Sequence, residues 1–231
     1  FQQHPSIDEI YVACLEGWSA VLDAYARQFN ITKLKKIVTG GSTGQESIYN
    51  GLKAIKEDHE STSDIVVMIH DGNRPMLPQD VITDNLVKQK KYGSAVTVIP
   101  TTEVVFVSKD GIESNEALNR DELWRTQTPH SYAFDELWKV HNQAIKDGVT
   151  NMAASCSLMQ KYGYMTYFSK GSEKNIRDVL FRQRGQGIRI GTSNSQKYHT
   201  KRFSRGSDGS EQRRGRRIPD YSAEIWRVSY G

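Results

Sequence analysis

The amino-acid sequence predicts an α/β protein with a Rossmann-like, doubly wound and mostly parallel sheet that also carries a β-arm. Three observations support this fold class. Short apolar runs alternate with stretches of helical periodicity through the first half of the chain. The run Ile65–Ile69 is apolar at every position, as in a parallel strand that is covered on both faces. A glycine pair, Gly40 and Gly41, directly follows another strand, which is typical of a tight turn between a strand and a helix.

The first predicted elements alternate between strand and helix. Ile10–Cys14 predicts a short buried strand, and Ile37–Val38 predicts a second one. Between them, four apolar residues at helical spacing predict a helix with one apolar face: Val21, Leu22, Tyr25 and Phe29.

Later elements follow the same logic, with more irregular spacing after residue 100. Helices are predicted over Ser47–Glu57, Gln79–Tyr92, Phe134–Lys146 and Met152–Tyr162, and strands over Ala95–Ile99 and Tyr164–Phe168. Val104–Val107 and the stretch around Ile112 predict a hairpin.

Charge is distributed unevenly along the chain. The net charge is +4, but residues 177–231 hold 13 basic against 5 acidic residues, a local balance of +8. This part is rich in Gly, Ser, Arg and Gln with little apolar periodicity, which is typical of disorder. We therefore expect a domain over residues 1–177 and a basic, disordered tail over residues 178–231.

The two cysteines, Cys14 and Cys156, have neither zinc-binding spacing nor a disulfide framework. Both lie in apolar surroundings, so we expect them to be reduced and buried, and the protein to be cytoplasmic. No run of eighteen apolar residues is present, so no membrane partner is expected.

The first loop of chemical interest runs from Thr39 to Ser47 and contains three glycines. Glycines let the backbone approach a ligand closely, and Ser47 could cap a following helix whose N-terminus favours an anion. The carboxylate of Glu46 argues against a tight phosphate cradle. A flexible turn without a ligand is the alternative reading, and no Lys follows the last glycine as a Walker A motif requires.

The second loop, His70–Pro75, follows the most apolar strand. Ligands of open α/β sheets bind at the carboxyl ends of strands, so Asp71 is placed to hold Mg²⁺ or another divalent cation against phosphates. Gly72 leaves room for a nucleotide. Arg74 could pair with a phosphate or with Asp71, and a local turn with a salt bridge is the alternative reading.

Four motifs in order carry a family resemblance: V-T-G-G-x-x-G-Q-E-S from Val38, I-H-D-G-N-R-P from Ile69, R-T-Q-T-P-H-S-Y from Arg125, and G-S-E-K-N-I-R from Gly171. Together they resemble the methylerythritol-phosphate and ribitol-5-phosphate cytidylyltransferases, whose fold is of the nucleotide-diphospho-sugar transferase type. Ser155–Met159 is more similar to the ribitol-phosphate branch.

The resemblance implies transfer of CMP from CTP to an alditol phosphate with release of pyrophosphate, in isoprenoid or teichoic acid synthesis. It implies Asp71 as the metal ligand and Arg74 as a catalytic residue. It implies a homodimer whose arm, Val104–Leu118, reaches into the neighbouring site. The implied substrate contacts are Thr128, Gln143 (where the family has Arg) and Arg177 (where it has Lys). The implied nucleotide contacts are Gly41, Ser42, Thr43, Gly44, Gln45, Glu46, Ser47 and Gly72.

The chain also departs from the family pattern. The family opens with a strand and a Gly-rich loop that carries a catalytic Arg and Lys, and neither residue has a counterpart in this sequence, so we expect little or no turnover. After Arg177 the family pattern stops. An alternative reading is an inactive nucleotide-binding domain whose basic tail contacts RNA, although the tail has few regularly spaced aromatic residues. Another sugar-nucleotide transferase on this fold is a third reading.

Overall fold

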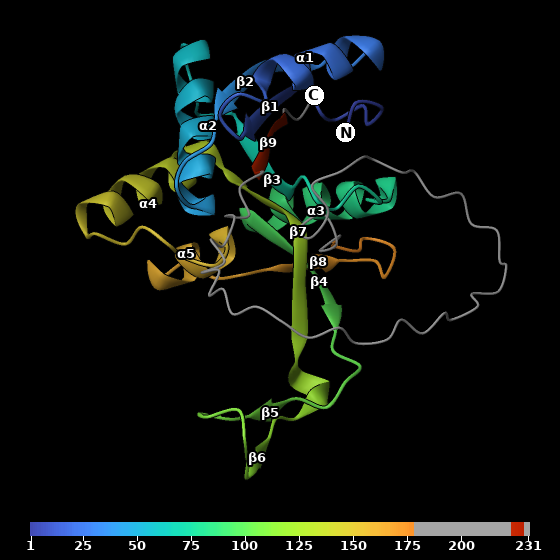
Figure 1. Ribbon diagram of the computed structural model, residues 1–231, viewed down its shortest axis with the longest axis vertical. Coiled ribbons are helices and arrows are strands. Elements are labelled where there is room, and N and C mark those ends of the chain that lie inside the picture. Colours follow the sequence, from blue (N-terminus) through green and yellow to red (C-terminus); the bar gives the residue numbers. More distant parts are fainter. Residues whose placement is uncertain (178–222, 229–231) are drawn as a thin grey trace, which may run out of the picture. The chain divides into compact units, whose positions relative to one another are not determined.

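The computed structural model describes residues 1–177 and 223–228. Its centre is a seven-stranded sheet with the order β2-β1-β9-β3-β7-β4-β8 (Figure 1). The strands are β1 (Glu9–Cys14), β2 (Leu34–Thr39), β3 (Val66–Asp71), β4 (Ser94–Pro100), β7 (Trp124–Ala133), β8 (Phe168–Lys170) and β9 (Ala223–Val228).

Five strands of this sheet run in one direction. β1 pairs parallel with β2, and β4 pairs parallel with β8. β9 is antiparallel to both β1 and β3, and β7 is antiparallel to both β3 and β4, so only these two strands are reversed. The predicted α/β class with a mostly parallel central sheet is confirmed.

Helices cover both faces of the sheet and define two apolar cores. They are α1 (Ser19–Gln28), α2 (Gly44–Asp58), α3 (Gln79–Tyr92), α4 (Phe134–Lys146) and α5 (Ser155–Lys161). Alternate residues of β3 point to opposite faces, as the two-residue period of a strand requires. Val67 and Ile69 pack with α2, α4 and α5, whereas Val66 and Met68 pack with α3. Both cysteines are free and buried, as predicted.

Most predicted elements lie where expected, and the differences have local causes. α2 begins at Gly44, before Ser47, because the hydroxyl of Thr43 accepts a hydrogen bond from Glu46 N and caps the helix. The helix predicted from Met152 begins at Ser155, and the last predicted strand is found as β8, at Phe168. The apolar face predicted for α1 exists, but much of it is exposed: Val21, Tyr25 and Phe29.

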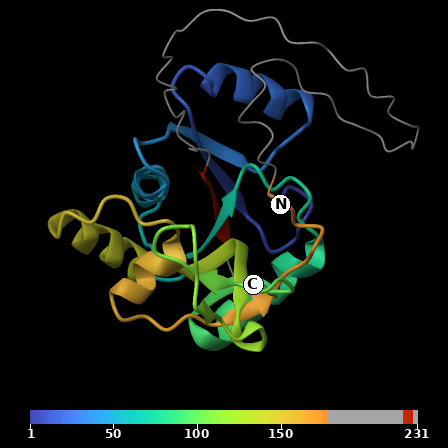
Figure 2. The ribbon, with the colours of Figure 1, turned by 60° about the horizontal axis from the view of Figure 1, so that its bottom comes forward.

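β9 revises the boundary that the sequence predicts at Arg177. These six residues lie between β1 and β3 (red in Figure 2) and belong to the same compact unit as the rest of the sheet. The segment A-E-I-W-R-V has the β-branched and aromatic residues of a strand, although its surroundings in the sequence are basic. Residues 178–222 and 229–231 of the predicted tail lie outside the described residues.

The predicted hairpin forms a small separate sheet. β5 (Phe106–Val107) pairs antiparallel with β6 (Glu116–Ala117), so the returning strand lies later than predicted. A 3₁₀ turn at Arg120–Glu122 leads from this arm into β7. No helix in the part of the chain that the structure describes is long and apolar enough to cross a membrane.

A buried amide on α3 joins three strands to that helix. Asn85 is fully buried, and its amide nitrogen donates to Thr97 Oγ1 (3.1 Å) on β4 and to Ser169 Oγ (2.8 Å) on β8. Its amide oxygen accepts from Ser131 Oγ on β7. These bonds satisfy polar groups that would otherwise be desolvated without partners.

Replacing Asn85 should therefore destabilise the fold. We predict that Asn85→Ala lowers the free energy of unfolding by roughly 2–3 kcal/mol, because three hydroxyls lose a buried partner. Chemical denaturation measures this value, with the exposed Asn115→Ala as the matched control. Equal stability of the two variants would contradict the role of the network.

Candidate functional site

A cavity of about 220 Å³ opens at the carboxyl end of β3. This is the edge at which open α/β sheets bind ligands. The cavity brings together residues from both predicted loops and from the two later motifs. The predicted site residues that line it are Gly44, Gln45, Asp71, Arg74, Thr128 and Arg177.

Two guanidinium groups surround the single carboxylate of this cavity. Asp71 Oδ2 lies 3.2 Å from Arg74 Nε and 3.9 Å from Arg177 Nε. Arg74 also donates to the backbone oxygen of Asn175 (2.9 Å), which ties the second loop to the last motif. The salt bridge considered from the sequence is therefore present, and it places two positive charges at one end of the cavity.

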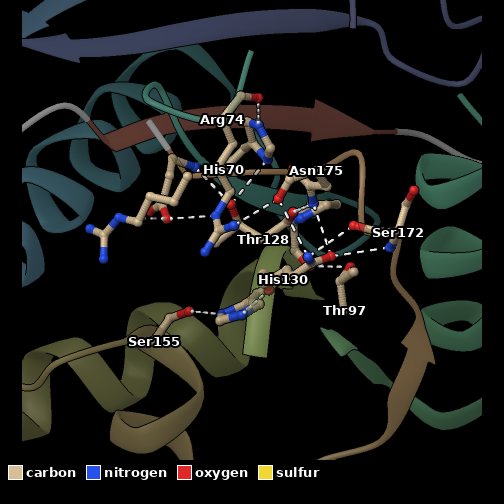
Figure 3. Close-up of polar contacts among 12 residues, drawn as sticks. His70, Arg74, Thr97, Thr128, His130, Ser155, Ser172 and Asn175 are labelled. Carbon is tan, nitrogen blue, oxygen red and sulfur yellow. Dashed lines mark hydrogen bonds and ion pairs between the residues drawn. The ribbon is translucent and has the colours of Figure 1, made fainter. Parts of the chain in front are cut away.

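Thr128 positions the loop that carries Asp71 (Figure 3). Its hydroxyl accepts a hydrogen bond from Asp71 N (3.0 Å) and lies 3.1 Å from His70 Nδ1. His70 Nε2 lies 3.0 Å from the backbone oxygen of Arg74, which can only accept, so this nitrogen carries the proton. His70 Nδ1 is then the acceptor for the hydroxyl of Thr128. The chain of bonds holds both ends of the Asp71–Arg74 turn.

A second histidine makes the same kind of bridge. His130 on β7 donates from Nε2 to the backbone oxygen of Gln127 (2.9 Å), and its Nδ1 accepts from Ser155 Oγ (2.8 Å). Ser155 is the first residue of α5, so this bond attaches that helix to β7 (Figure 3). Asn175 adds a third tie, because its side chain donates to the backbone oxygen of Thr128 (2.7 Å).

Burial keeps the imidazoles at this site neutral. Desolvation lowers the pKa of His70 to about 4 and that of His130 to about 4. The neutral form is the one that both bridges require, because each ring has one nitrogen that donates and one that accepts. His141 on α4 also lines the cavity, and desolvation lowers its pKa to about 4.

The glycine loop is closed by its own side chains. Gly41 N donates to Ser47 Oγ (3.0 Å), and Ser47 Oγ donates to the backbone oxygen of Thr43 (3.0 Å). A Cβ on Gly41 would meet the side chain of Glu46 at 2.2 Å, so only glycine fits. The carboxylate of Glu46 accepts from Ser42 Oγ (2.6 Å), and the bonds from Ser42 hold its pKa below the usual range. The carboxylate of Glu46 therefore stabilises the loop by accepting hydrogen bonds from Ser42. From the sequence, the same carboxylate was expected to repel phosphate.

Gln45 connects this loop to the segment before α5. Its amide nitrogen donates to the backbone oxygen of Val149 (2.6 Å), and its amide oxygen accepts from Met152 N (2.9 Å). Thr43 Oγ1 donates to the backbone oxygen of Thr150 (2.9 Å). Two residues that the resemblance assigns to the nucleotide thus also hold one wall of the cavity.

Seven predicted site residues do not line the cavity: Gly41, Ser42, Thr43, Glu46, Ser47, Gly72 and Gln143. Gly72 is exposed beside Asp71. Gln143 is exposed on α4, and its amide donates to Asp147 (2.8 Å). Sequence reasoning missed His130, His141 and Asn175. His141 could have been predicted as a buried residue from its position in the apolar repeat of α4. Phe134, Leu137 and Ala144 lie on the same buried face of that helix.

Asp71 is the carboxylate that lines the cavity, so it is the described side chain that would hold a divalent cation there. Among the described residues, no group of three or more His, Cys, Asp or Glu side chains is placed to bind a metal. Mg²⁺ is commonly held by one or two carboxylates together with substrate phosphates, so one carboxylate suffices when phosphates supply further oxygens.

Comparisons with known proteins agree on one family. Residues 1–180 match the family model for 2-C-methyl-D-erythritol 4-phosphate cytidylyltransferase. A ribitol-5-phosphate cytidylyltransferase from Lacticaseibacillus paracasei is 35% identical over 179 residues, which cover 77% of this chain and 76% of that protein. One from Vibrio parahaemolyticus is 39% identical over 178 residues, covering 77% and 74%. A 2-C-methyl-D-erythritol 4-phosphate cytidylyltransferase from Clostridium tetani is 34% identical over 186 residues, covering 78% and 73%.

Solved structures show the same fold. The 2-C-methyl-D-erythritol 4-phosphate cytidylyltransferase from Francisella tularensis aligns with a TM-score of 0.64 at 25% identity and covers 77% of each chain. The 4-diphosphocytidyl-2C-methyl-D-erythritol synthase from Anaerococcus prevotii aligns with a TM-score of 0.67 at 18% identity, covering 77% of this chain and 75% of that one.

The neutral histidines predict a pH dependence of stability. His70, His130 and His141 have folded-state pKa values near 4, below the value of about 6.5 for an unfolded chain. Their contribution to the free energy of unfolding is fully present above pH 6.5. It falls as the pH decreases toward 4, because the unfolded state binds protons first. Each histidine contributes up to about 1.4 kcal/mol per pH unit in this window.

Urea unfolding between pH 7 and pH 5 measures this slope. We predict that His130→Gln, which cannot titrate, makes the slope shallower by up to about 1.4 kcal/mol per pH unit, whatever its effect on stability at pH 7. An unchanged slope would mean that His130 is not a neutral buried group.

Proposed function

Since the chain belongs to the 2-C-methyl-D-erythritol 4-phosphate cytidylyltransferase family, we propose that it transfers CMP from CTP to an alditol phosphate and releases pyrophosphate. The observation that carries the proposal is the cavity in which Asp71, Arg74 and Arg177 converge beside the glycine loop. This arrangement suits a ligand with several phosphate oxygens.

In the proposed reaction, a phosphate oxygen of the alditol phosphate attacks the α-phosphorus of CTP. A bond forms between that oxygen and the α-phosphorus, and the bond to the bridging oxygen of the β-phosphate breaks. Pyrophosphate takes the electron pair and leaves. Such a reaction depends mostly on positioning and on neutralising charge, since the groups that react are all negative.

In this proposal, one group of residues contacts the nucleotide and another contacts the phosphates. Gly44 and Gln45, which line the cavity at the start of α2, contact the nucleotide in this proposal. Arg177 and Arg74 attract the phosphates, and Thr128 keeps the Asp71 loop in place through its two hydrogen bonds. Thr128 acts as a positioning residue in this proposal.

Asp71 is the residue that would hold Mg²⁺. When bound, the ion would neutralise charge on the phosphates and orient them. Asp71 is about one-third exposed, so its carboxylate is accessible from the cavity.

We propose ribitol 5-phosphate as the alditol phosphate. The relatives named for that substrate include proteins 35% and 39% identical to this chain, and the one named for methylerythritol phosphate is 34% identical. The stretch Ser155–Met159 also favours the ribitol-phosphate branch. Comparing the two alditol phosphates in one assay tests the choice.

Asp71→Asn should weaken the Mg²⁺-dependent binding of CTP tenfold or more, which corresponds to at least ~1.4 kcal/mol. The reason is the loss of the charged oxygen ligand, while the size of the side chain is kept. Calorimetric titration with CTP, with and without Mg²⁺, measures the effect. Pyrophosphate release in the presence of ribitol 5-phosphate is recorded on the same samples.

The matched control is Asp64→Asn, because Asp64 is exposed and lies just before β3. If Asp71→Asn binds CTP as tightly as this control, Asp71 is not the metal ligand. Failure of the unmodified chain to bind CTP would reject the proposed function itself.

We also propose that the protein forms a homodimer through the arm around β5 and β6. Figure 1 shows the arm extending away from the central sheet. Apolar side chains on the arm are exposed, among them Val104 (62%), Phe106 (64%) and Ile112 (87%). Exposed apolar groups on a protruding segment are typical of an interaction surface.

Phe106→Ser should weaken this dimer roughly 10- to 100-fold, because burying a Phe side chain is worth about 1.5–3 kcal/mol. Sedimentation equilibrium measures the dissociation constant. Val87→Ser removes an apolar residue of similar exposure on α3 (58%) and serves as the control. Dimers of equal strength in both variants would place the interface elsewhere.

A further inference from the structure

His141 is a buried polar residue on the apolar face of α4. Only 1% of its surface is exposed, and its neighbours on that face are Leu137, Val140 and Ala144. Its ring lines the same cavity as Asp71 and Thr128. Its Nε2 has no hydrogen-bond partner among the residues that the structure describes. Buried polar groups in folded proteins are normally paired, so this nitrogen calls for an explanation.

The other polar groups on this wall already have partners. Both ends of the Gln45 amide bond to the segment before α5, and Ser155 bonds to His130. The remaining side chains around that part of the cavity are apolar: Ile48, Met152 and Leu158. No charged side chain contributes to the lowered pKa of His141, because desolvation by burial is its cause.

The lining of the cavity thus combines two chemically different groups of side chains. The first group is Asp71, Arg74 and Arg177, which suits phosphate and a cation. The second is the imidazole of His141 with its apolar neighbours, and burial keeps this ring uncharged at neutral pH. A neutral imidazole pairs well with a hydroxyl group, which can donate to it or accept from it.

We propose that His141 Nε2 hydrogen-bonds a hydroxyl of the polyol chain of the alditol phosphate and thereby selects a hydroxylated substrate. The phosphate of that substrate lies toward Arg177. This inference rests on the proposed function, since it names how the same site recognises its second substrate.

A purely structural role for His141 makes a different prediction. The ring stacks on Tyr49 with a centroid distance of 6.2 Å, so it also contributes to packing. If packing were its whole role, replacing it with Leu would lower stability and leave ligand selectivity unchanged. If Nε2 is reserved for a ligand, replacing an unpaired buried polar group with an apolar one leaves the free protein as stable or more stable.

The test compares two ligands on the full chain and on its variants. Calorimetric titration is done with ribitol 5-phosphate and with pentyl phosphate, which has the same chain length and no hydroxyls on the chain. For His141→Leu we expect ribitol 5-phosphate to bind about 5- to 15-fold more weakly, and pentyl phosphate to bind as before. The melting temperature of the ligand-free variant should be equal to that of the unmodified chain or higher.

Two further variants sharpen the comparison. His141→Gln keeps an amide nitrogen near the place of Nε2 and should restore most of the affinity for ribitol 5-phosphate. His59→Leu is the matched control, because His59 lies outside the cavity beside Glu9 and should not affect either ligand.

The outcomes separate the inference from the proposed function. Three results for His141→Leu would overturn the role of His141. They are an equal loss of affinity for both ligands, no loss of affinity for either, and a lower melting temperature with unchanged selectivity between the two. An unmodified chain that binds CTP but not ribitol 5-phosphate would also overturn it. A chain that binds ribitol 5-phosphate but not CTP would reject the transfer reaction, while the His141 variants would still decide the inference.

Discussion

The site depends on the hydroxyl of Thr128, which joins the end of β3 to the neighbouring strand β7. One hydroxyl accepts from the backbone of Asp71 and donates to His70, and His70 in turn holds the backbone of Arg74. Both hydrogen bonds of His70 can form only if its imidazole is neutral. Burial keeps it neutral by lowering its pKa. The sheet therefore fixes the positions of both charged groups, because Asp71 is the last residue of β3 and Arg74 lies in the turn that follows it.

The same logic extends to the opposite wall of the cavity. Gln45 and Thr43, at the start of α2, bond to the backbone of residues 149–152. His130 attaches α5 to β7 through Ser155. The start of α2, residues 149–152, α5 and β7 are thus parts of one hydrogen-bonded frame.

Periodicity in the sequence was sufficient for the main helices and buried strands, because apolar burial determines both. It was insufficient where partners distant in sequence decide the structure. β7 is rich in polar residues, and its buried Thr128 and His130 are explained only by neighbours on β3 and α5. Helical geometry also separates two residues that lie close in sequence: α4 turns His141 into the cavity and leaves Gln143 exposed. Asp71 and Arg177 were predicted as site residues from sequence motifs, and the structure places their side chains close together.

The central position of β9 has a consequence for how the chain folds. β1 and β3 are joined in the described sheet through β9 alone, and Glu9 is paired with Arg227, more than 200 residues away in the sequence. Contacts of such high sequence separation form slowly, because a long loop must close before they stabilise anything. The pairings of the described sheet give two groups of strands, β2 with β1 and β3 with β7, β4 and β8. The main-chain hydrogen bonds that join these two groups cannot form before residues 223–228 are in place, so the edges of β1 and β3 are the last part of the sheet to be paired.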